Sequence, residues 1–204
     1  MRDGLEGGFA DPVLDAQSAF RAIMDGMARP GTVQSVRLAL VPPAPFTPVT
    51  AAVALTLCDH ETPVWLDPAL AASLEVARWL AFHSGAPLTQ EPSEAVFAFA
   101  ADPQALPPLA GFSQGSPEYP DRSTTLVLAV EEIESSSAGA AAPCWVLDGP
   151  GIEATERLLV RGLCGSFVEQ WRDNRARFPR GVDVILAGRD RLACLPRTTT
   201  IKEG

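Results

Sequence analysis

The side chains that could act in catalysis are few in this sequence of 204 residues. Of its 16 basic residues Lys202 is the sole lysine, and its histidines are His60 and His83. Many catalytic bases, acids and nucleophiles are Lys, His or Tyr, so several familiar mechanisms are excluded at once. A P-loop is excluded as well, because GxxxxGK[ST] needs a lysine before Ser or Thr, and Lys202 precedes Glu203. Coding bias explains the many arginines but does not restore a missing catalytic lysine.

His83 and Asp59 are the candidates for acid–base chemistry. His83 closes an expected helix, where it could act as a base or simply interact with the helix dipole. Asp59 lies before the short apolar run at 64–66, and Glu61 and Asp67 flank the same run. Carboxylates gathered in this way could hold a metal ion, but charged residues at strand ends are routine. We therefore expect no metal site, and the catalytic role of His83 and Asp59 stays open.

Arg197, Thr198 and Thr199 are the candidates for anion binding. They stand in the segment Pro196–Thr200, directly after an expected strand. A guanidinium beside hydroxyl groups is well suited to a phosphate or phosphonate, because it donates charge-assisted hydrogen bonds. A hydroxyl-rich strand exit without a ligand is equally consistent with this segment. Together with His83 and Asp59, Arg197 could also serve a free-standing enzyme that acts on a phosphorylated or phosphonate substrate.

A glycine pair at 149 and 151 resembles a nucleotide-binding fingerprint in its letters. The segment Gly149–Ala154 matches G-x-G-x-x-A after an expected strand. That fingerprint needs a helix whose N-terminus meets the pyrophosphate, and residues 156–160 are as typical of a strand as of a helix. Pro150 also removes a backbone donor between the glycines. A tight turn is the favoured interpretation.

The expected helix starts in this chain share one sequence pattern, an Asp before a Pro. Asp11-Pro12, Asp67-Pro68 and Asp102-Pro103 each combine an N-cap carboxylate with a proline suited to the first helical position. Thr47-Pro48 repeats the pattern with a hydroxyl. Apolar residues then recur with helical period after Asp11 and after Asp67. Residues 167–176 are expected to form a last, polar helix.

Short apolar runs between these helices predict strands. They lie at 33–38, 64–66, 96–99, 126–130 and 145–147, and 182–187 with 192–195 predicts a hairpin. Residues 134–143 are expected to form an exposed loop. Strands that alternate with helices predict an α/β protein, a three-layer α/β/α sandwich with a mixed sheet. We expect a single domain over residues 1–204, with 1–10 as a flexible N-terminus.

Charge and composition limit the partners. The formal net charge of −9 opposes binding to nucleic acid. Residues 1–156 carry 6 arginines and 20 acids, whereas 157–202 carry 9 arginines, one lysine and 4 acids. That basic last quarter could attract an anionic ligand or an acidic partner, or lie as a solvated face. The longest apolar run is too short to cross a membrane. Four cysteines without a CxxC pair favour free thiols in a reducing cytoplasm.

Several of these segments, in consistent order, resemble the PhnH family, the H subunit of the bacterial carbon–phosphorus lyase system. The resemblance runs from about Asp11 to Thr199, and its clearest part is the C-terminal block. The segments that carry it are Asp15–Gln17 with Phe20-Arg21, Met27 and Pro30-Gly31, then Leu55–Leu57, Thr62–Leu66, Phe82-His83, Ala86-Pro87, Gly149–Ile152, Phe178–Asp183 and Pro196–Thr199.

The resemblance implies a cytoplasmic accessory subunit used in phosphonate breakdown. Such subunits join PhnG, PhnI and PhnJ in a core complex that makes ribose 1-phosphonate 5-triphosphate from ATP and a phosphonate, and they are also known as homodimers. The implied fold resembles a reduced form of the pyridoxal-phosphate-dependent transferases. Those enzymes bind their cofactor through a lysine, and Lys202 lies beyond the last expected strand. The resemblance therefore implies that architecture without a cofactor, and a subunit that is not catalytic alone.

Overall fold

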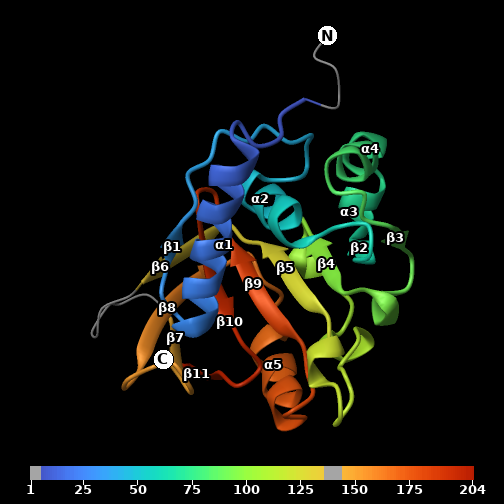
Figure 1. Cartoon of the computed structure of the whole chain (residues 1–204). Helices are drawn as coiled ribbons and strands as arrows, with labels where there is room; N and C mark the ends of the chain where they lie inside the picture. Colours follow the sequence, from blue (N-terminus) through green and yellow to red (C-terminus); the bar gives the residue numbers. More distant parts are fainter. Residues whose placement is uncertain (1–5, 136–143) are drawn as a thin grey trace.

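The computed structural model describes residues 6–135 and 144–204, which form a mixed α/β fold (Figure 1). Five α-helices lie within these residues. They are α1 (Pro12–Ala28), α2 (Pro48–Leu57), α3 (Pro68–Ala71), α4 (Leu74–His83) and α5 (Phe167–Ala176).

The strands form two sheets. The larger has seven strands in the order β1-β10-β9-β5-β4-β2-β3, and the smaller has four in the order β11-β7-β8-β6. In the larger sheet β9, β5, β4, β2 and β3 are parallel to one another, and β10 is antiparallel to both of its neighbours, β9 and β1. The smaller sheet is antiparallel throughout. The strands are β1 (Gln34–Ser35), β2 (Val64–Leu66), β3 (Leu88–Thr89), β4 (Phe97–Ala100), β5 (Thr125–Ala129), β6 (Glu132–Ser135), β7 (Trp145–Asp148), β8 (Glu156–Arg161), β9 (Asp183–Ala187), β10 (Arg191–Leu195) and β11 (Thr200–Glu203).

The central strands are buried on both faces, as their continuous apolar runs predict. Val127 and Ile185 pack in one core with residues of α1, α2 and α4. Their neighbours Leu126 and Val184 point the opposite way, into a second core that also contains Trp171 of α5. Successive side chains of a strand alternate between faces, so each run supplies both cores.

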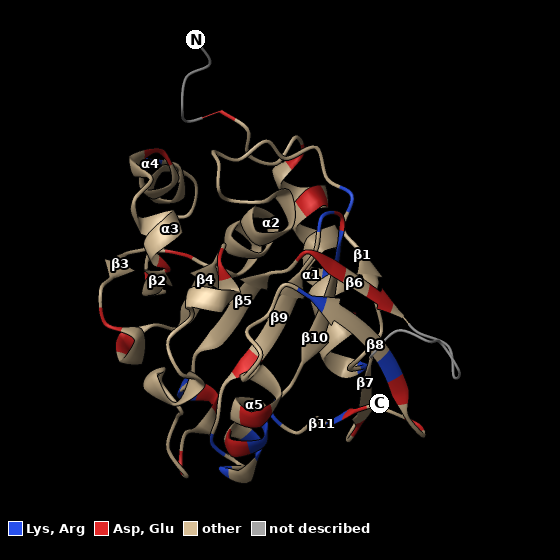
Figure 2. Ribbon diagram, turned by 180° about the vertical axis from the view of Figure 1, so that it is seen from behind, with Lys and Arg blue, Asp and Glu red and all other residues tan. Residues whose placement is uncertain are grey.

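The prediction of a three-layer α/β/α sandwich is confirmed only in part. Helices α1 to α4 cover one face of the seven-stranded sheet, and Figure 2 shows α5 beside the smaller sheet on the other. That layer is therefore half helix and half antiparallel sheet. The difference arises because residues 156–161, equally typical of strand and helix, pair as β8 with β6 and β7.

Most of the expected helix starts are confirmed. Asp11 accepts hydrogen bonds from the amides of Val13 and Leu14 at the start of α1, and Thr47 forms a capping box with Thr50 at the start of α2. The carboxylate of Asp67 is fully buried and accepts from the amides of Leu70 and Asp102, each at 2.8 Å. Asp67 therefore begins α3 and also ties it to the end of β4.

Other expectations differ from the structure. Asp102 begins a single 3-10 turn rather than a longer helix. The helix expected after Asp67 is split, because Ser73 caps a new helix, α4, by accepting from the amide of Val76. Strand β6 extends to Ser135, so the first two residues of the loop expected at 134–143 belong to a strand, and residues 136–143 lie outside the described part. Strands β3 and β11 were not expected; both are short and lie at sheet edges.

The first described residues pack against the helix layer. The backbone carbonyl of Glu6 accepts a hydrogen bond from Trp79 Nε1 of α4, and the carbonyl of Gly7 accepts from the amide of Val41. Of the N-terminus expected to be flexible, Glu6 and Gly7 make these contacts, and residues 1–5 lie outside the described part. Within the described ranges, no helix is both long enough and apolar enough to span a bilayer.

Candidate functional site

Arg197 lies in the C-terminal block and is one of the three candidates for anion binding. It follows β10, and Asp183 begins β9, so the antiparallel pairing of these strands brings the two residues together. The guanidinium forms an ion pair with the Asp183 carboxylate, and Arg197 Nε lies 3.1 Å from Asp183 Oδ1. The amide of Arg197 donates to the same oxygen at 2.7 Å. The side chains are only 13% and 21% exposed, so the pair is largely shielded from water.

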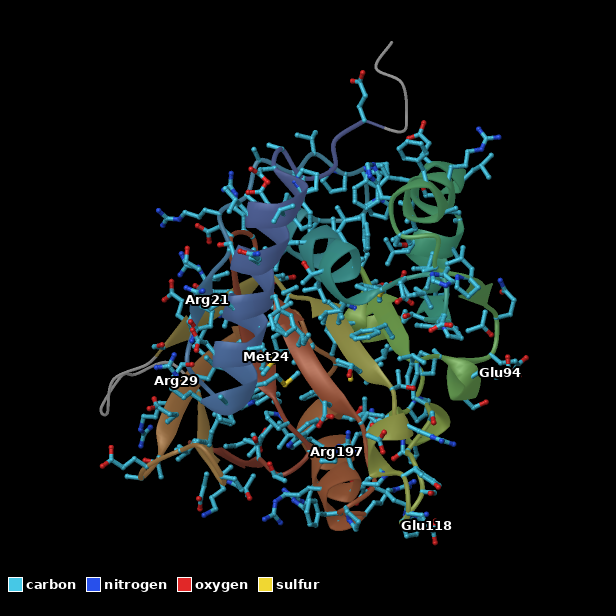
Figure 3. The ribbon with its side chains drawn as sticks, viewed as in Figure 1. Arg21, Met24, Arg29, Glu94, Glu118 and Arg197 are labelled. Carbon is cyan, nitrogen blue, oxygen red and sulfur yellow. The ribbon has the colours of Figure 1, made fainter. Side chains whose placement is uncertain are left out.

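Every donor of the Arg197 guanidinium is already used. Beyond Asp183 it donates to Ser123 Oγ at 2.6 Å, to the carbonyl of Pro120 at 2.6 Å and to that of Pro179 at 3.4 Å. An arginine has five N–H donors, and these contacts account for all of them. Arg197, which lies near α5 in Figure 3, therefore joins its own segment to 120–123 and to 179–183. Anion binding by Arg197 stays a prediction, and it would require an anion to displace Asp183.

Thr198 and Thr199, which follow Arg197, lie in different surroundings. Thr199 is fully buried, its carbonyl accepts from Trp171 Nε1 at 2.9 Å, and its hydroxyl has no hydrogen-bond partner among the described residues. Thr198 lines a surface hollow of about 280 Å³ together with Pro150, Arg175 and Phe178. Only Thr198 is placed to meet a ligand from solvent.

Helix α5 is held to the C-terminal block by its buried face. The Asn174 amide donates to the carbonyl of Val182 at 2.9 Å and its oxygen accepts from the amide of Val182 at 2.8 Å. Trp171 is likewise buried and bonded to Thr199. The opposite side of the helix end is exposed and carries arginines (Figure 2). We call this part of the surface the arginine end: the exposed Arg172, Arg175, Arg177 and Arg180, which flank the exposed Phe178 in the sequence.

His83 and Asp59 are not brought to Arg197. His83 ends α4, with its ring 4.6 Å from that of Trp79, and α4 and α5 lie at opposite ends of the molecule in both views (Figures 1 and 2). Asp59 caps its own turn, since Asp59 Oδ1 accepts from Thr62 Oγ1 at 2.7 Å and from the amide of Glu61 at 2.9 Å. These hydrogen bonds, with that of Thr62 the stronger cause, lower the pKa of Asp59. The geometry does not assemble an active site from the three candidates.

A second hollow in the described part of the chain was not expected from the sequence. It measures about 810 Å³ and opens at the carboxyl ends of β5 and β9, where ligands of parallel sheets commonly bind. Arg37 and Arg189 line it, but so do Glu131 and Asp190, and Asp190 pairs with Arg37 at 3.6 Å. The pKa of Asp190 is lowered, first by its hydrogen bond from Arg191. Four segments of the chain, 36–38, 44–48, 130–131 and 187–190, line this hollow. The one sequence signal that could have indicated it is the general rule that ligands bind at the carboxyl ends of parallel strands.

The chain offers no fit for a pyridoxal phosphate cofactor. Lys202 is exposed on β11, an edge strand of the smaller sheet, so it does not reach the carboxyl ends of the parallel strands. Across residues 6–135 and 144–204, no cluster of three or more His, Cys, Asp or Glu is arranged to hold a metal ion. The cysteines are free thiols; burial raises the pKa of Cys58 to about 12 and that of Cys194 higher still. Such thiols stay protonated and are poor nucleophiles.

The glycine pair at 149 and 151 forms a turn, as favoured above. It connects β7 to β8, and no helix follows it. Gly151 has φ +84°, and a Cβ there would lie 2.2 Å from the carbonyl oxygen of Ala28 at the end of α1. The glycine thus serves close packing, and the dinucleotide interpretation is excluded.

Fold and site together define a mixed α/β protein with surface features suited to binding and without an assembled set of catalytic groups in its described part. The comparison with known families is more specific. The family model described as bacterial phosphonate metabolism protein (PhnH) matches residues 7–202. The chain belongs to the PhnH family.

Two relatives extend the match. The chain is 47% identical over 196 residues to the alpha-D-ribose 1-methylphosphonate 5-triphosphate synthase subunit PhnH of Rhizobium meliloti (strain 1021), covering 96% of this chain and 94% of the relative. It is 32% identical over 186 residues to the putative C-P lyase subunit protein HtxG of Stutzerimonas stutzeri, covering 91% and 85%. Both relatives carry the word subunit in their names.

Proposed function

We propose that this chain is an accessory subunit of a carbon–phosphorus lyase core complex and acts in the breakdown of organic phosphonates. In that role it supports the conversion of ATP and an alkylphosphonate to a ribose 1-phosphonate 5-triphosphate. The observation that carries the proposal is the 47% identity to a synthase subunit over nearly the full length of both chains. The separation of His83 and Asp59 from Arg197 supports a subunit that is not catalytic alone.

The finer assignments follow from the family resemblance. We propose that the partners are subunits of the PhnG, PhnI and PhnJ type, that the chain forms a homodimer when isolated, and that it works in the cytoplasm. The likeness to a reduced pyridoxal-phosphate-dependent transferase belongs to the same set of proposals. An anionic phosphonate or nucleotide would be a ligand of the assembled complex, and the 810 Å³ hollow offers it more room than the segment around Arg197.

Co-expression of the tagged chain with G, I and J type subunits tests the proposal. We expect all of them to co-purify, and we expect the isolated chain to leave ATP and methylphosphonate unconsumed. Turnover by the isolated chain that is lost in His83→Ala would contradict the accessory role and favour a free-standing enzyme. Failure of the subunits to co-purify would contradict membership of the complex.

A further inference from the structure

The arginine end has an excess of positive charge. Residues 172–180 contain four arginines and one acid, Asp173. All four arginines are exposed, and none lies within 4.0 Å of a carboxylate oxygen in the described part of the chain. By contrast, Arg29, Arg37, Arg161, Arg191 and Arg197 each form an ion pair. What distinguishes the arginine end is therefore that four arginines without an ion pair in the described part lie within nine consecutive residues.

The backbone under these arginines is fixed. Asn174 and Trp171 tie α5 to Val182 and Thr199, and Arg197 joins Pro179 to Pro120 and Asp183. A partner that binds here meets a surface whose backbone is already ordered. Less conformational entropy is then lost on association, so the binding free energy is more favourable.

An apolar anchor lies among the charges. The side chain of Phe178 is 61% exposed and offers an apolar surface beside the arginines. Beside it is the hollow of about 280 Å³ lined by Pro150, Arg175 and Thr198, which is large enough for a side chain of a partner. Aromatic residues and arginines dominate the binding energy of protein interfaces when they surround such hollows.

We propose that the arginine end is the surface through which this chain docks onto an acidic face of another subunit of its complex. The inference rests on the proposed function, because it presupposes such a complex. Carboxylates of the partner pair with Arg172, Arg175, Arg177 and Arg180, and one partner side chain enters the hollow beside Phe178. Arginine is suited to this role because its planar group binds a carboxylate through two parallel hydrogen bonds.

Charge argues against a second copy of the chain and against nucleic acid as the occupant. In a two-fold symmetric dimer this surface would meet itself, and like charges would repel. A head-to-tail contact with the acidic part of another copy would produce a ring or an open chain of molecules rather than a two-fold dimer. A polyanion the size of nucleic acid would also face the net charge of −9 of the whole molecule.

The test is a matched pair of charge reversals in the tagged full-length chain, co-expressed with the other subunits of its complex. Arg175→Glu/Arg177→Glu changes the arginine end. The control, Arg21→Glu/Arg78→Glu, makes the same change in charge at exposed, unpaired arginines of α1 and α4; Figure 3 shows Arg21 well away from Arg197. We expect the first variant to weaken capture of the other subunits about 100-fold and the control to leave it unchanged. A third variant, Phe178→Ala, should weaken capture without changing charge.

The outcomes separate this inference from the function on which it rests. If the unmodified chain captures no other subunit, the proposed function fails and the inference fails with it. If the unmodified chain captures them and the arginine-end variant does so equally well, only the inference is overturned. Equal losses in the two charge variants would overturn it too, because net charge alone would then explain the effect. Circular dichroism of each variant confirms that it is folded. Binding of the unmodified chain, but not the variant, to vesicles of phosphatidylcholine and phosphatidylserine, with capture intact, would assign the surface to a membrane instead.

Discussion

Arg197 and Arg175 are arginines of the same basic region, yet they serve opposite purposes. Arg197 is 13% exposed, with five donors bonded to Asp183, Ser123, Pro120 and Pro179. Arg175 is exposed and makes one long hydrogen bond, 3.4 Å from Nε to the carbonyl of Thr198. The net charge of the region does not distinguish the two arginines. Burial and hydrogen-bond partners decide whether an arginine stabilises the fold or stays available to a partner.

The largest expected effect concerns the buried member of this comparison. Arg197→Met removes the partner of the Asp183 carboxylate and leaves two carbonyls without their donors, and we expect the free energy of unfolding to fall by about 2–4 kcal/mol. Urea unfolding followed by tryptophan fluorescence measures it. The matched variant Arg175→Met should change it by less than about 0.5 kcal/mol. Similar losses in both variants would remove the distinction between the two arginines.

Asn174 and Arg177 provide a second comparison between a buried and an exposed side chain, at the C-terminal part of α5. Asn174→Ala leaves the amide and carbonyl of Val182 buried and unpaired, so we expect a loss of about 1–3 kcal/mol in unfolding free energy. Arg177→Ala, three residues on at the exposed end of the helix, serves as the control and should cost less than about 0.5 kcal/mol. Chemical denaturation of both variants is the measurement. An unchanged Asn174→Ala variant would mean that α5 is held by other contacts.

Neutralising the arginine end should barely affect the isolated chain. We expect Arg172→Gln/Arg180→Gln to change the free energy of unfolding by no more than about 0.5 kcal/mol, because neither side chain forms an ion pair in the described part. Differential scanning calorimetry at low and at high salt measures the change. A loss above about 1 kcal/mol would show that these arginines stabilise the fold.

The smallest effect is expected at Asp59, a polar group with only local partners. Its pKa is lowered chiefly by the Thr62 hydroxyl, so the stability it contributes is present above its ordinary pKa and is lost as pH falls through the lowered value. Thr62→Val should raise the pKa of Asp59 toward its ordinary value. A titration of the Asp59 carboxyl by NMR measures the shift. An unchanged pKa in this variant would show that the hydroxyl is not the main cause.

Local signals in the sequence predicted most elements but not their assembly. The Asp-Pro and Thr-Pro pairs located α1, α2 and α3, and the polar helix expected at 167–176 matches α5 to the residue. The smaller sheet was missed in part because β6 and β11 are short and polar and gain their stability by pairing with β8 and β7. Such pairing depends on residues distant in the sequence, and no local pattern records it.

The sequence identified residues of the candidate site by their type, but it did not predict what each of them contacts. The sequence singled out Arg197 as a special arginine, but its acceptors come from two segments, 120–123 and 179–183, that only the fold brings together. Asp183, its main partner, lies at the start of the strand before β10, and an acid there opposite an arginine after the hairpin is the signal that could have found it. The sequence could not show that the arginines of the arginine end lack ion pairs in the described part, because ion pairing depends on which carboxylates lie nearby in space.

Amide hydrogen exchange of residues 172–182 tests the central claim most directly. It would be measured on the isolated chain and on the purified complex with the other subunits, at the same pH and temperature. We predict that exchange in this segment slows at least about tenfold on assembly, while that of the exposed part of α1 is unchanged. Unchanged exchange at 172–182 in a complex that demonstrably contains the chain would contradict the account.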